Sequence, residues 1–201
     1  MNIVTMRTPD HDALYRVAEQ QAGYFTSNQA AGVGFSWERL SDYSKNGRFN
    51  RVVHGVYRLA QFPSSRFEDL FVAWLRCGPK SAISHESALA LYDLSDILPG
   101  EVHVTIPRTA SRRRKGIRLH TNRLSPANVV KREGLRVTSV PRTIADVAKA
   151  GLSEDHIARA IRQVFERGLT TGRALLAEAK RRGGRAARLI NSYSSPPKGH
   201  S

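Results

Sequence analysis

The segment GRFNRVVHGVYRL, residues 47–59, constrains the fold more than any other part of the sequence. Apolar and polar residues alternate on both sides of Gly55, which predicts two short strands joined by a tight turn. Gly47 stands where a preceding helical pattern ends, which is typical of a residue that terminates a helix. The elements before the hairpin then decide between an ordinary basic hairpin and one that contacts a polyanion.

Three predicted helices precede this hairpin. The first covers residues 10–21, and a short second helix begins at Thr26 or Ser27 and ends near Ala31. Glycines within 32–34 form a turn that lets two helices meet at a steep angle. Ser36 is placed to cap the third helix, which runs up to Gly47. This order predicts a winged helix-turn-helix, with the hairpin as its wing.

The rest of the chain predicts a second domain. Helical patterns cover 68–78, 84–91, 141–151, 153–168 and 170–184, and strand patterns cover 101–107, 116–121 and 134–140. The predicted fold class is α+β: an N-terminal winged helix-turn-helix followed by a mixed α/β C-terminal domain with a small sheet packed by helices. The predicted boundaries are an N-terminal tail at 1–9, the winged helix-turn-helix at 10–62, a linker at 63–67, the α/β domain at 68–183 and a basic, disordered tail at 184–201.

The charge of the chain indicates an anionic partner. Lys and Arg number 32 against 17 Asp and Glu among 201 residues, a formal net charge of +15. Such an excess is typical of proteins that meet nucleic acid, an anionic membrane or an acidic protein. Residues 1–65 carry only seven basic against five acidic side chains, so most of the excess lies downstream, in 108–123 and the tail.

Other bulk features point to the cytoplasm. The single cysteine, Cys77, rules out an intramolecular disulfide, which fits a reducing compartment. The first twelve residues lack the apolar core of a secretory signal. No apolar run approaches the ~18 residues that a membrane-spanning helix needs. We therefore expect a cytoplasmic protein with no membrane partner.

Three blocks of sequence resemble the AbiEi-type antitoxins of type IV toxin–antitoxin systems. In residues 25–59 the family's glycine turn, helix leucine and hairpin pattern correspond to Gly34, Leu40, Gly47, Phe49, Arg51, Gly55, Val56 and Tyr57. The segments SHESALALYDL (84–94) and VPRTIADVA (140–148) are similar to motifs of the family's C-terminal domain. The resemblance covers roughly residues 10 to 180, although this chain is shorter than many members.

The resemblance implies a function that composition and periodicity do not show. It implies a winged-helix domain that binds double-stranded DNA and an α/β antitoxin domain. It also implies repression of the protein's own operon through inverted repeats. The implied functional partner is a nucleotidyltransferase-like toxin, which is neutralised without a stable complex.

The predicted DNA contacts follow from how side chains read DNA: arginine pairs with guanine and amides pair with adenine in the major groove, while basic side chains meet phosphates. The recognition-helix candidates are Ser36, Trp37, Arg39, Ser41, Lys45 and Asn46, and those of the helix before it are Ser27, Asn28 and Gln29. The wing candidates are Arg48, Arg51, His54 and Arg58. A C-terminal basic patch comprises Arg112, Arg113, Arg114, Lys115 and Arg118.

Less specific interpretations remain open for these residues. The basic wing and the 111–115 run can be solvated surface, and Glu38 and Asp42 can complement the positive end of a helix dipole. Arg142 and Asp146 are spaced to form an ion pair within a helix. The alternative functions are a nuclease or nucleotide-processing enzyme with a DNA-binding domain, and an RNA-binding adaptor.

Catalytic and metal motifs are weak in this sequence. Asp93, Asp96 and Glu101 resemble a nuclease carboxylate set, but residue 103 is His where a lysine is expected. His85 and Glu86 resemble the start of a zinc helix, but residue 89 is Leu rather than the second histidine. We therefore expect no catalytic residues, no metal and no cofactor, with Ser84 capping the helix that contains His85.

Overall fold

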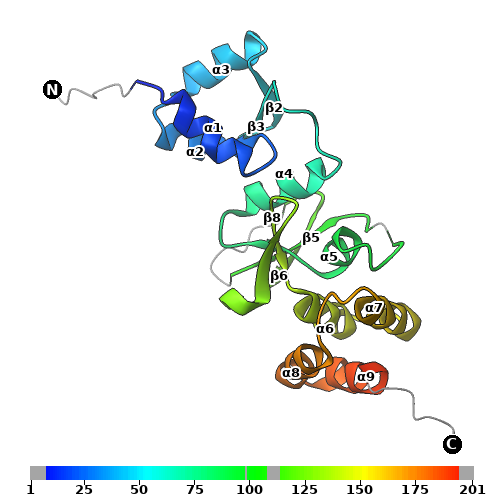
Figure 1. Ribbon diagram of the computed structural model, residues 1–201. Helices are drawn as coiled ribbons and strands as arrows, with labels where there is room; N and C mark the ends of the chain where they lie inside the picture. Colours follow the sequence, from blue (N-terminus) through cyan, green and yellow to red (C-terminus); the bar gives the residue numbers. More distant parts are fainter. Residues whose placement is uncertain (1–7, 98, 108–113, 195–201) are drawn as a thin grey trace, which may run out of the picture. The chain divides into compact units, whose positions relative to one another are not determined.

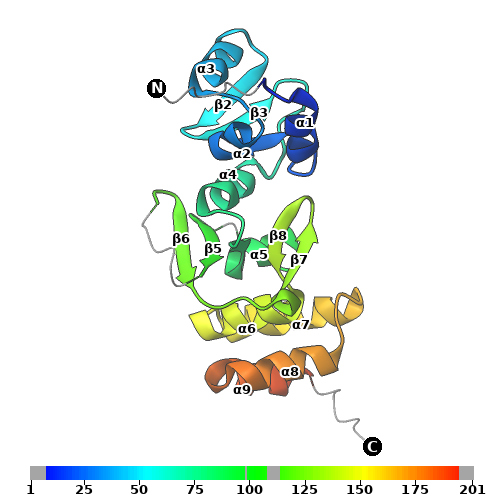
Figure 2. The ribbon, with the colours of Figure 1, turned by 90° about the vertical axis from the view of Figure 1, so that its left-hand side faces the viewer.

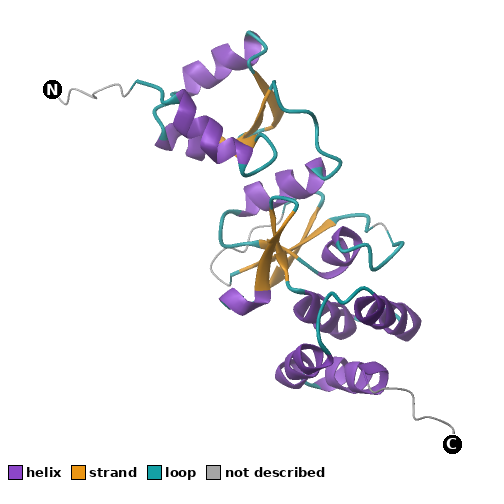
Figure 3. Ribbon diagram, viewed as in Figure 1, coloured by secondary structure: helices purple, strands orange, loops and turns teal. Residues whose placement is uncertain are grey.

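The computed structural model describes residues 8–97, 99–107 and 114–194 (Figure 1). The chain divides into two compact units: unit 1 is Met1–Pro79 with Glu133–Leu135, and unit 2 is Lys80–Arg132 with Arg136–Ser201. Helices and a small sheet occur in each unit, as the purple and orange ribbons of Figure 3 show. This composition confirms the predicted α+β class.

Unit 1 has the element order that the sequence predicts, with one added strand. The elements are α1 (His11–Glu19), β1 (Tyr24–Thr26), α2 (Ser27–Gly32), α3 (Trp37–Lys45), β2 (Phe49–Val53), β3 (Val56–Leu59) and α4 (Glu68–Cys77). The strands form an antiparallel sheet in the order β1-β3-β2, and Figure 2 shows β2 beside β3. The short strand β1, which was not predicted, makes β3 the central strand.

Local hydrogen bonds explain where the helices of unit 1 begin and end. Thr26 and Gln29 form a capping box at α2, in which Gln29 N donates to Thr26 Oγ1 at 3.1 Å and Thr26 N donates to Gln29 Oε1 at 2.8 Å. Ser36 Oγ accepts from Arg39 N and caps α3. Gly47, with φ +70°, ends α3 in the left-handed conformation that favours glycine. The predicted helix signals are thus confirmed.

An aromatic core joins the helices of unit 1 to one face of the sheet. Its buried members are Leu14, Ala18, Phe25, Ala30, Phe35, Leu40, Phe49, Tyr57 and Leu59. The ring of Phe25 meets Phe49 edge to face at 5.1 Å and stacks on Tyr57 at 5.7 Å between centroids. These contacts fix the angle between the helices and the β2–β3 hairpin.

The opposite face of the same sheet is covered by α4. Tyr24 of β1 stacks on Phe71 of α4 at 5.2 Å between ring centroids, and the Tyr24 hydroxyl donates to Glu68 Oε2 at 2.6 Å. These contacts place α4 in unit 1, which ends at Pro79. The structure therefore differs from the predicted boundary, which set the linker at 63–67 and assigned α4 to the C-terminal domain.

Unit 2 is a five-stranded sheet with helices packed against it. Its elements are β4 (Ala82–Ile83), α5 (His85–Leu91), β5 (Val102–Ile106), β6 (Ile117–Thr121), η1 (Pro126–Asn128), β7 (Val129–Arg132), β8 (Leu135–Thr138), α6 (Val140–Ala150), α7 (Glu154–Glu166), α8 (Gly172–Arg182) and α9 (Gly184–Ser194). The strand order is β6-β5-β4-β8-β7, and β5 and β6 pair in parallel. The helix α6 packs against α5, α7, α8 and α9.

The helix α9 replaces most of the predicted basic tail. Ala186, Leu189 and Ile190 are buried at helical spacing and bind α9 to α6, α7 and α8. An apolar stripe of this kind stabilises a helix even where arginines flank it. The prediction of a disordered tail from residue 184 is therefore wrong for 184–194, and residues 195–201 lie outside the described part.

A buried ion-pair network holds α6 against α8. Arg142 is 1% exposed, and its Nε donates to Asp146 Oδ2 at 2.7 Å, as the spacing of these residues predicts. The other carboxylate oxygen of Asp146 lies 3.3 Å from Arg182, whose Nε donates to Glu178 at 3.1 Å. Asn128 joins the same network through its contact with Arg142.

Removing Arg142 should strongly destabilise unit 2. Arg142→Ala leaves the carboxylate of Asp146 buried with less compensating charge, so we expect the free energy of unfolding to fall by about 3–5 kcal/mol. The matched control is Arg159→Ala, because Arg159 pairs with Asp96 at a site where the two side chains are 59% and 97% exposed. That change should cost less than about 1 kcal/mol. Urea unfolding of both variants measures the difference, and equal losses would contradict the role of the buried network.

Candidate nucleic-acid interface

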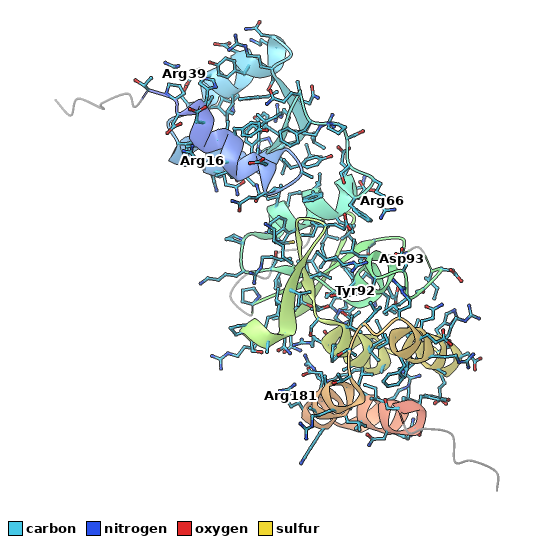
Figure 4. All side chains as sticks on the ribbon, viewed as in Figure 1. Arg16, Arg39, Arg66, Tyr92, Asp93 and Arg181 are labelled. Atoms are coloured by element: carbon cyan, nitrogen blue, oxygen red, sulfur yellow. The ribbon has the colours of Figure 1, made fainter. Side chains whose placement is uncertain are left out.

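The helix α3 presents three different faces. Leu40 and Tyr43 pack into the aromatic core. Trp37, Ser41 and Lys45 follow one another at four-residue spacing and therefore share a second face. Arg39 is exposed and lies on roughly the opposite side of the helix from Trp37, because successive residues turn by about 100°. The predicted recognition residues thus divide between two edges of α3, and Figure 4 labels Arg39.

The second face of α3 borders a hollow beside the wing. The hollow measures about 280 Å³ and is lined by Trp37, Ser41, Ser44, Lys45, Arg51 and Tyr57. Arg51 reaches it because this residue pairs across the ladder with Tyr57, on the face of the sheet that points to the helices. The structure therefore brings four predicted contacts together: Trp37, Ser41, Lys45 and Arg51.

Two cations line this hollow. Among the residues that the structure describes, neither Lys45 nor Arg51 forms an ion pair with a carboxylate. The guanidinium of Arg51 instead lies 2.9 Å from Nδ1 of His54, at the turn of the wing. Two exposed cations with free bonding capacity beside a helix are a suitable site for phosphate oxygens.

Two other wing residues have different surroundings. Arg48 lies over the Tyr43 ring at 5.2 Å, at the C-terminal end of α3. Arg58 is half-buried on the sheet face that α4 covers, with its guanidinium 5.9 Å from the Tyr24 ring. Because Tyr57 and Arg58 alternate along β3, Arg58 points away from the hollow that Arg51 lines. The structure therefore does not bring Arg58 together with the other wing candidates.

The three DNA-contact candidates on α2 differ in how accessible their side chains are to a ligand. Gln29 uses its side chain in the capping box and donates to Gln21 Oε1 at 3.0 Å. Ser27 is half-buried, and Asn28 is exposed. Asn28 is thus the α2 candidate whose side chain is the most accessible to a ligand.

The N-terminus of α3 carries an exposed carboxylate with a local role. A hydrogen bond with Ser36 lowers the pKa of Glu38, and the backbone of Glu38 adds to this effect. Glu38 lies in the first turn of α3, where a negative charge also complements the helix dipole. This contact supports the capping interpretation of Glu38.

The C-terminal basic patch lies in unit 2. Arg112 and Arg113 fall outside the described residues. Arg114 forms a β-bridge with Ile117, and Lys115 and Arg118 are exposed at the start of β6. Arg118 also lines a second hollow with His103 and His120.

Those histidines belong to a group that sequence reasoning missed. His85, His103 and His120 come from α5, β5 and β6, and their ring nitrogens converge. Motif spacing cannot find such a group, because its members are separated by whole elements. The predicted capping role of Ser84 is not confirmed. Its side chain forms no capping hydrogen bond to α5 and instead accepts a hydrogen bond from Thr105.

Unit 1 has the element order of a winged helix-turn-helix, with an exposed edge of α3 beside the strand β2. Residues 12–60 match the family model "Transcriptional regulator, AbiEi antitoxin". This match confirms the family resemblance over the segment from α1 to β3. The family description names a regulator rather than an enzyme. No curated protein matches the chain.

A solved structure shares the fold. The RV2827C protein from Mycobacterium tuberculosis matches with a TM-score of 0.55 and 14% sequence identity, over 93% of this chain and 78% of that chain. At this identity the likeness concerns the fold alone. Separately, within the described ranges, no helix is long and apolar enough to cross a membrane.

Truncating Trp37 and truncating Leu40 should change the free energy of unfolding by very different amounts. Trp37 is 68% exposed at the start of α3, whereas Leu40 is 2% exposed. Leu40→Ala should lower the free energy of unfolding by about 2–5 kcal/mol, because it opens a cavity in the aromatic core. Trp37→Ala should change it by less than about 0.5 kcal/mol. Chemical denaturation of both variants measures these effects, and a large loss from Trp37→Ala would show that Trp37 has a packing role instead.

Proposed function

We propose that the chain is a DNA-binding transcriptional repressor that acts as the antitoxin of a type IV toxin–antitoxin system. It represses its own operon by binding inverted repeats of double-stranded DNA in the cytoplasm. Its functional partner is a nucleotidyltransferase-like toxin, which it opposes without forming a stable complex. The observation that carries the DNA-binding part is the convergence of Lys45 and Arg51 at the hollow between α3 and the wing.

The arrangement of side chains supports a specific docking mode. The exposed arc of α3 enters the major groove, where Arg39 on one edge of the helix contacts base edges and Lys45 on the other edge contacts the phosphate backbone. Ser41 lies on the same face of α3 as Lys45 and can bond to base edges or phosphates. Arg51 on the wing contacts the backbone next to Lys45. Trp37 packs its exposed ring against the sugar–phosphate wall.

The basic patch of unit 2 has a supporting role in this proposal. Arg112 to Lys115 and Arg118 attract DNA without sequence preference, because contacts to phosphates carry no base information. Unit 1 contributes the discrimination between sequences, and the patch contributes affinity that falls with salt. The family match covers residues 12–60 and lies within unit 1, so the antitoxin role of unit 2 rests on the motifs at 84–94 and 140–148.

Changes at the hollow should weaken DNA binding. We expect the double variant Lys45→Ala with Arg51→Ala to bind a duplex from the gene's own upstream region more weakly, and to bind scrambled DNA more weakly by a similar factor. Loss of two phosphate contacts should flatten the plot of log affinity against log salt by about two units of slope. Arg39→Ala should instead reduce the preference for the upstream duplex over scrambled DNA, by about 1–3 kcal/mol.

The matched control is Arg16→Ala. Arg16 is an exposed arginine on α1 of the same unit (Figure 4). Its removal takes away one positive charge at another place, as many as Arg39→Ala removes and half as many as the double variant removes. Fluorescence anisotropy at several salt concentrations compares the variants. If wild type binds both duplexes equally, it is not a sequence-specific repressor. If Arg16→Ala weakens binding as much as the change at the hollow, the hollow is not the interface.

If the chain is a type IV antitoxin, it should protect cells from the toxin without binding the toxin stably. We expect the neighbouring reading frame of the operon to encode a nucleotidyltransferase that arrests growth when expressed alone. Co-expression of this chain should restore growth, while the two purified proteins should elute separately in gel filtration. Co-elution would contradict the type IV mechanism, and a failure to restore growth would contradict the antitoxin role but leave DNA binding untouched.

A further inference from the structure

Three histidines converge in unit 2. His85 opens α5, His103 lies on β5 and His120 lies on the neighbouring strand β6. One ring nitrogen from each comes within 4.8 Å of the other two. The rings of His85 and His120 stack at 3.5 Å between centroids, and the His103 ring lies 5.1 Å from that of His120.

Two nitrogens in this cluster are buried without a partner. Nδ1 of His103 and Nε2 of His120 accept or donate no hydrogen bond among the described residues. His103 is only 5% exposed, so the unpaired nitrogen is not compensated by open solvent. A buried polar atom without a partner costs about 1–3 kcal/mol. A ligand that bonds to these nitrogens would remove that cost.

Other polar groups hold the rings from outside. Nδ1 of His85 lies 3.0 Å from the Ser84 hydroxyl, which accepts from Thr105 Oγ1 at 2.8 Å. Nε2 of His103 lies 3.9 Å from a carboxylate oxygen of Glu86. Groups of this kind orient metal-ligating histidines by binding the ring nitrogen that faces away from the ion. Each of these rings therefore keeps its other nitrogen for a ligand.

The protonation state also suits a ligand that needs lone pairs. Burial is the main cause that lowers the pKa of His85 to about 2, with the neighbouring His120 adding to the effect. Burial likewise lowers the pKa of His103 and of His120 to about 4. All three imidazoles are thus neutral at pH 7, which is the form that coordinates metal ions.

The backbone at His85 is unusual as well. His85 has φ +52°, in the left-handed region that residues with a Cβ rarely adopt. Such a conformation costs about 1–2 kcal/mol and persists where surrounding structure requires it. Here it places a histidine, rather than a glycine, at the junction between β4 and α5.

We propose that His85, His103 and His120 bind one divalent first-row transition metal ion, with Zn²⁺ as the best match. Three neutral imidazoles with one open position are a donor set that Zn²⁺ takes in proteins. His103 and His120 also line a hollow of about 350 Å³, together with residues that include Glu86, Arg118 and His156. Because Arg118 brings a positive charge to this hollow, an anionic group such as hydroxide fits the fourth position. The proposal does not depend on the DNA-binding function.

Cobalt substitution tests the site directly. Untagged, full-length protein is stripped of metal and titrated with Co²⁺, whose visible absorption reports tetrahedral nitrogen coordination. We expect one Co²⁺ per chain, displaced by Zn²⁺. His103→Gln and His120→Gln should each weaken binding by more than about 100-fold, which exceeds the loss typical of an outer-shell partner. Glu86→Gln should weaken it by about 10–100-fold.

The control is His54→Gln, which removes an exposed histidine from the wing and should leave the titration unchanged. Circular dichroism verifies that each variant is folded. X-ray absorption of the Zn²⁺-loaded wild type needs no variant and should show three imidazole ligands. The proposal is overturned if wild type binds no Co²⁺, if the ligand shell lacks imidazole, or if folded His103→Gln and His120→Gln bind Co²⁺ like wild type.

Discussion

Unit 1 depends on one constraint: its central strand β3 is covered on both faces. Tyr57 and Leu59 point into the aromatic core beneath α1, α2 and α3, while Val56 and Arg58 point to the face that α4 covers. A slip of one residue would exchange these two sets and bury Arg58 among aromatic rings. The register of β3 therefore fixes the wing, the place of α4 and the side chains that border α3.

This constraint explains which predictions from the sequence succeeded in unit 1. The helix order, the cap at Ser36 and the turn at Gly55 are local, so the sequence alone identifies them, and it narrows the cap of α2 to Thr26 or Ser27. The packing of α4 on the second face cannot be read from neighbouring residues, because it depends on the contact of Tyr24 with Phe71, which are nearly fifty residues apart in the sequence. For this reason the predicted linker at 63–67 precedes α4. The predicted wing likewise combines Arg58 with Arg51, although the two side chains lie on opposite faces of the sheet.

In unit 2 the sequence predicted α5 to α8 and the strands β5, β6 and β8, but not β4, β7, α9 or the convergence of the side chains. The spacing of Arg142 and Asp146 predicted their pair, since both lie on α6. The extension of this pair to Arg182 and Glu178 on α8 required the helix packing. The three histidines are likewise brought together by the β5–β6 pairing and the β4–α5 junction. Alternation along β5 and β6 locates His103 and His120 on strands, but only the parallel register of the two strands makes these residues neighbours.

The packing of the helices in unit 2 also accounts for part of the basic composition. Arg132 donates to the carbonyl of Leu91, and Arg167 donates to those of Tyr92 and Asp93, so two arginines satisfy the end of α5. Arg185 does the same for Ala148 and Leu152 at the end of α6. Helix C-termini favour such cations, because their last carbonyls lack partners within the helix. A share of the +15 charge is therefore fixed by the fold of unit 2. The net charge therefore overstates the number of cations available to DNA. Lys45 and Arg51, which are exposed and have no carboxylate partner in the described part of the chain, support DNA binding more strongly than the net charge does.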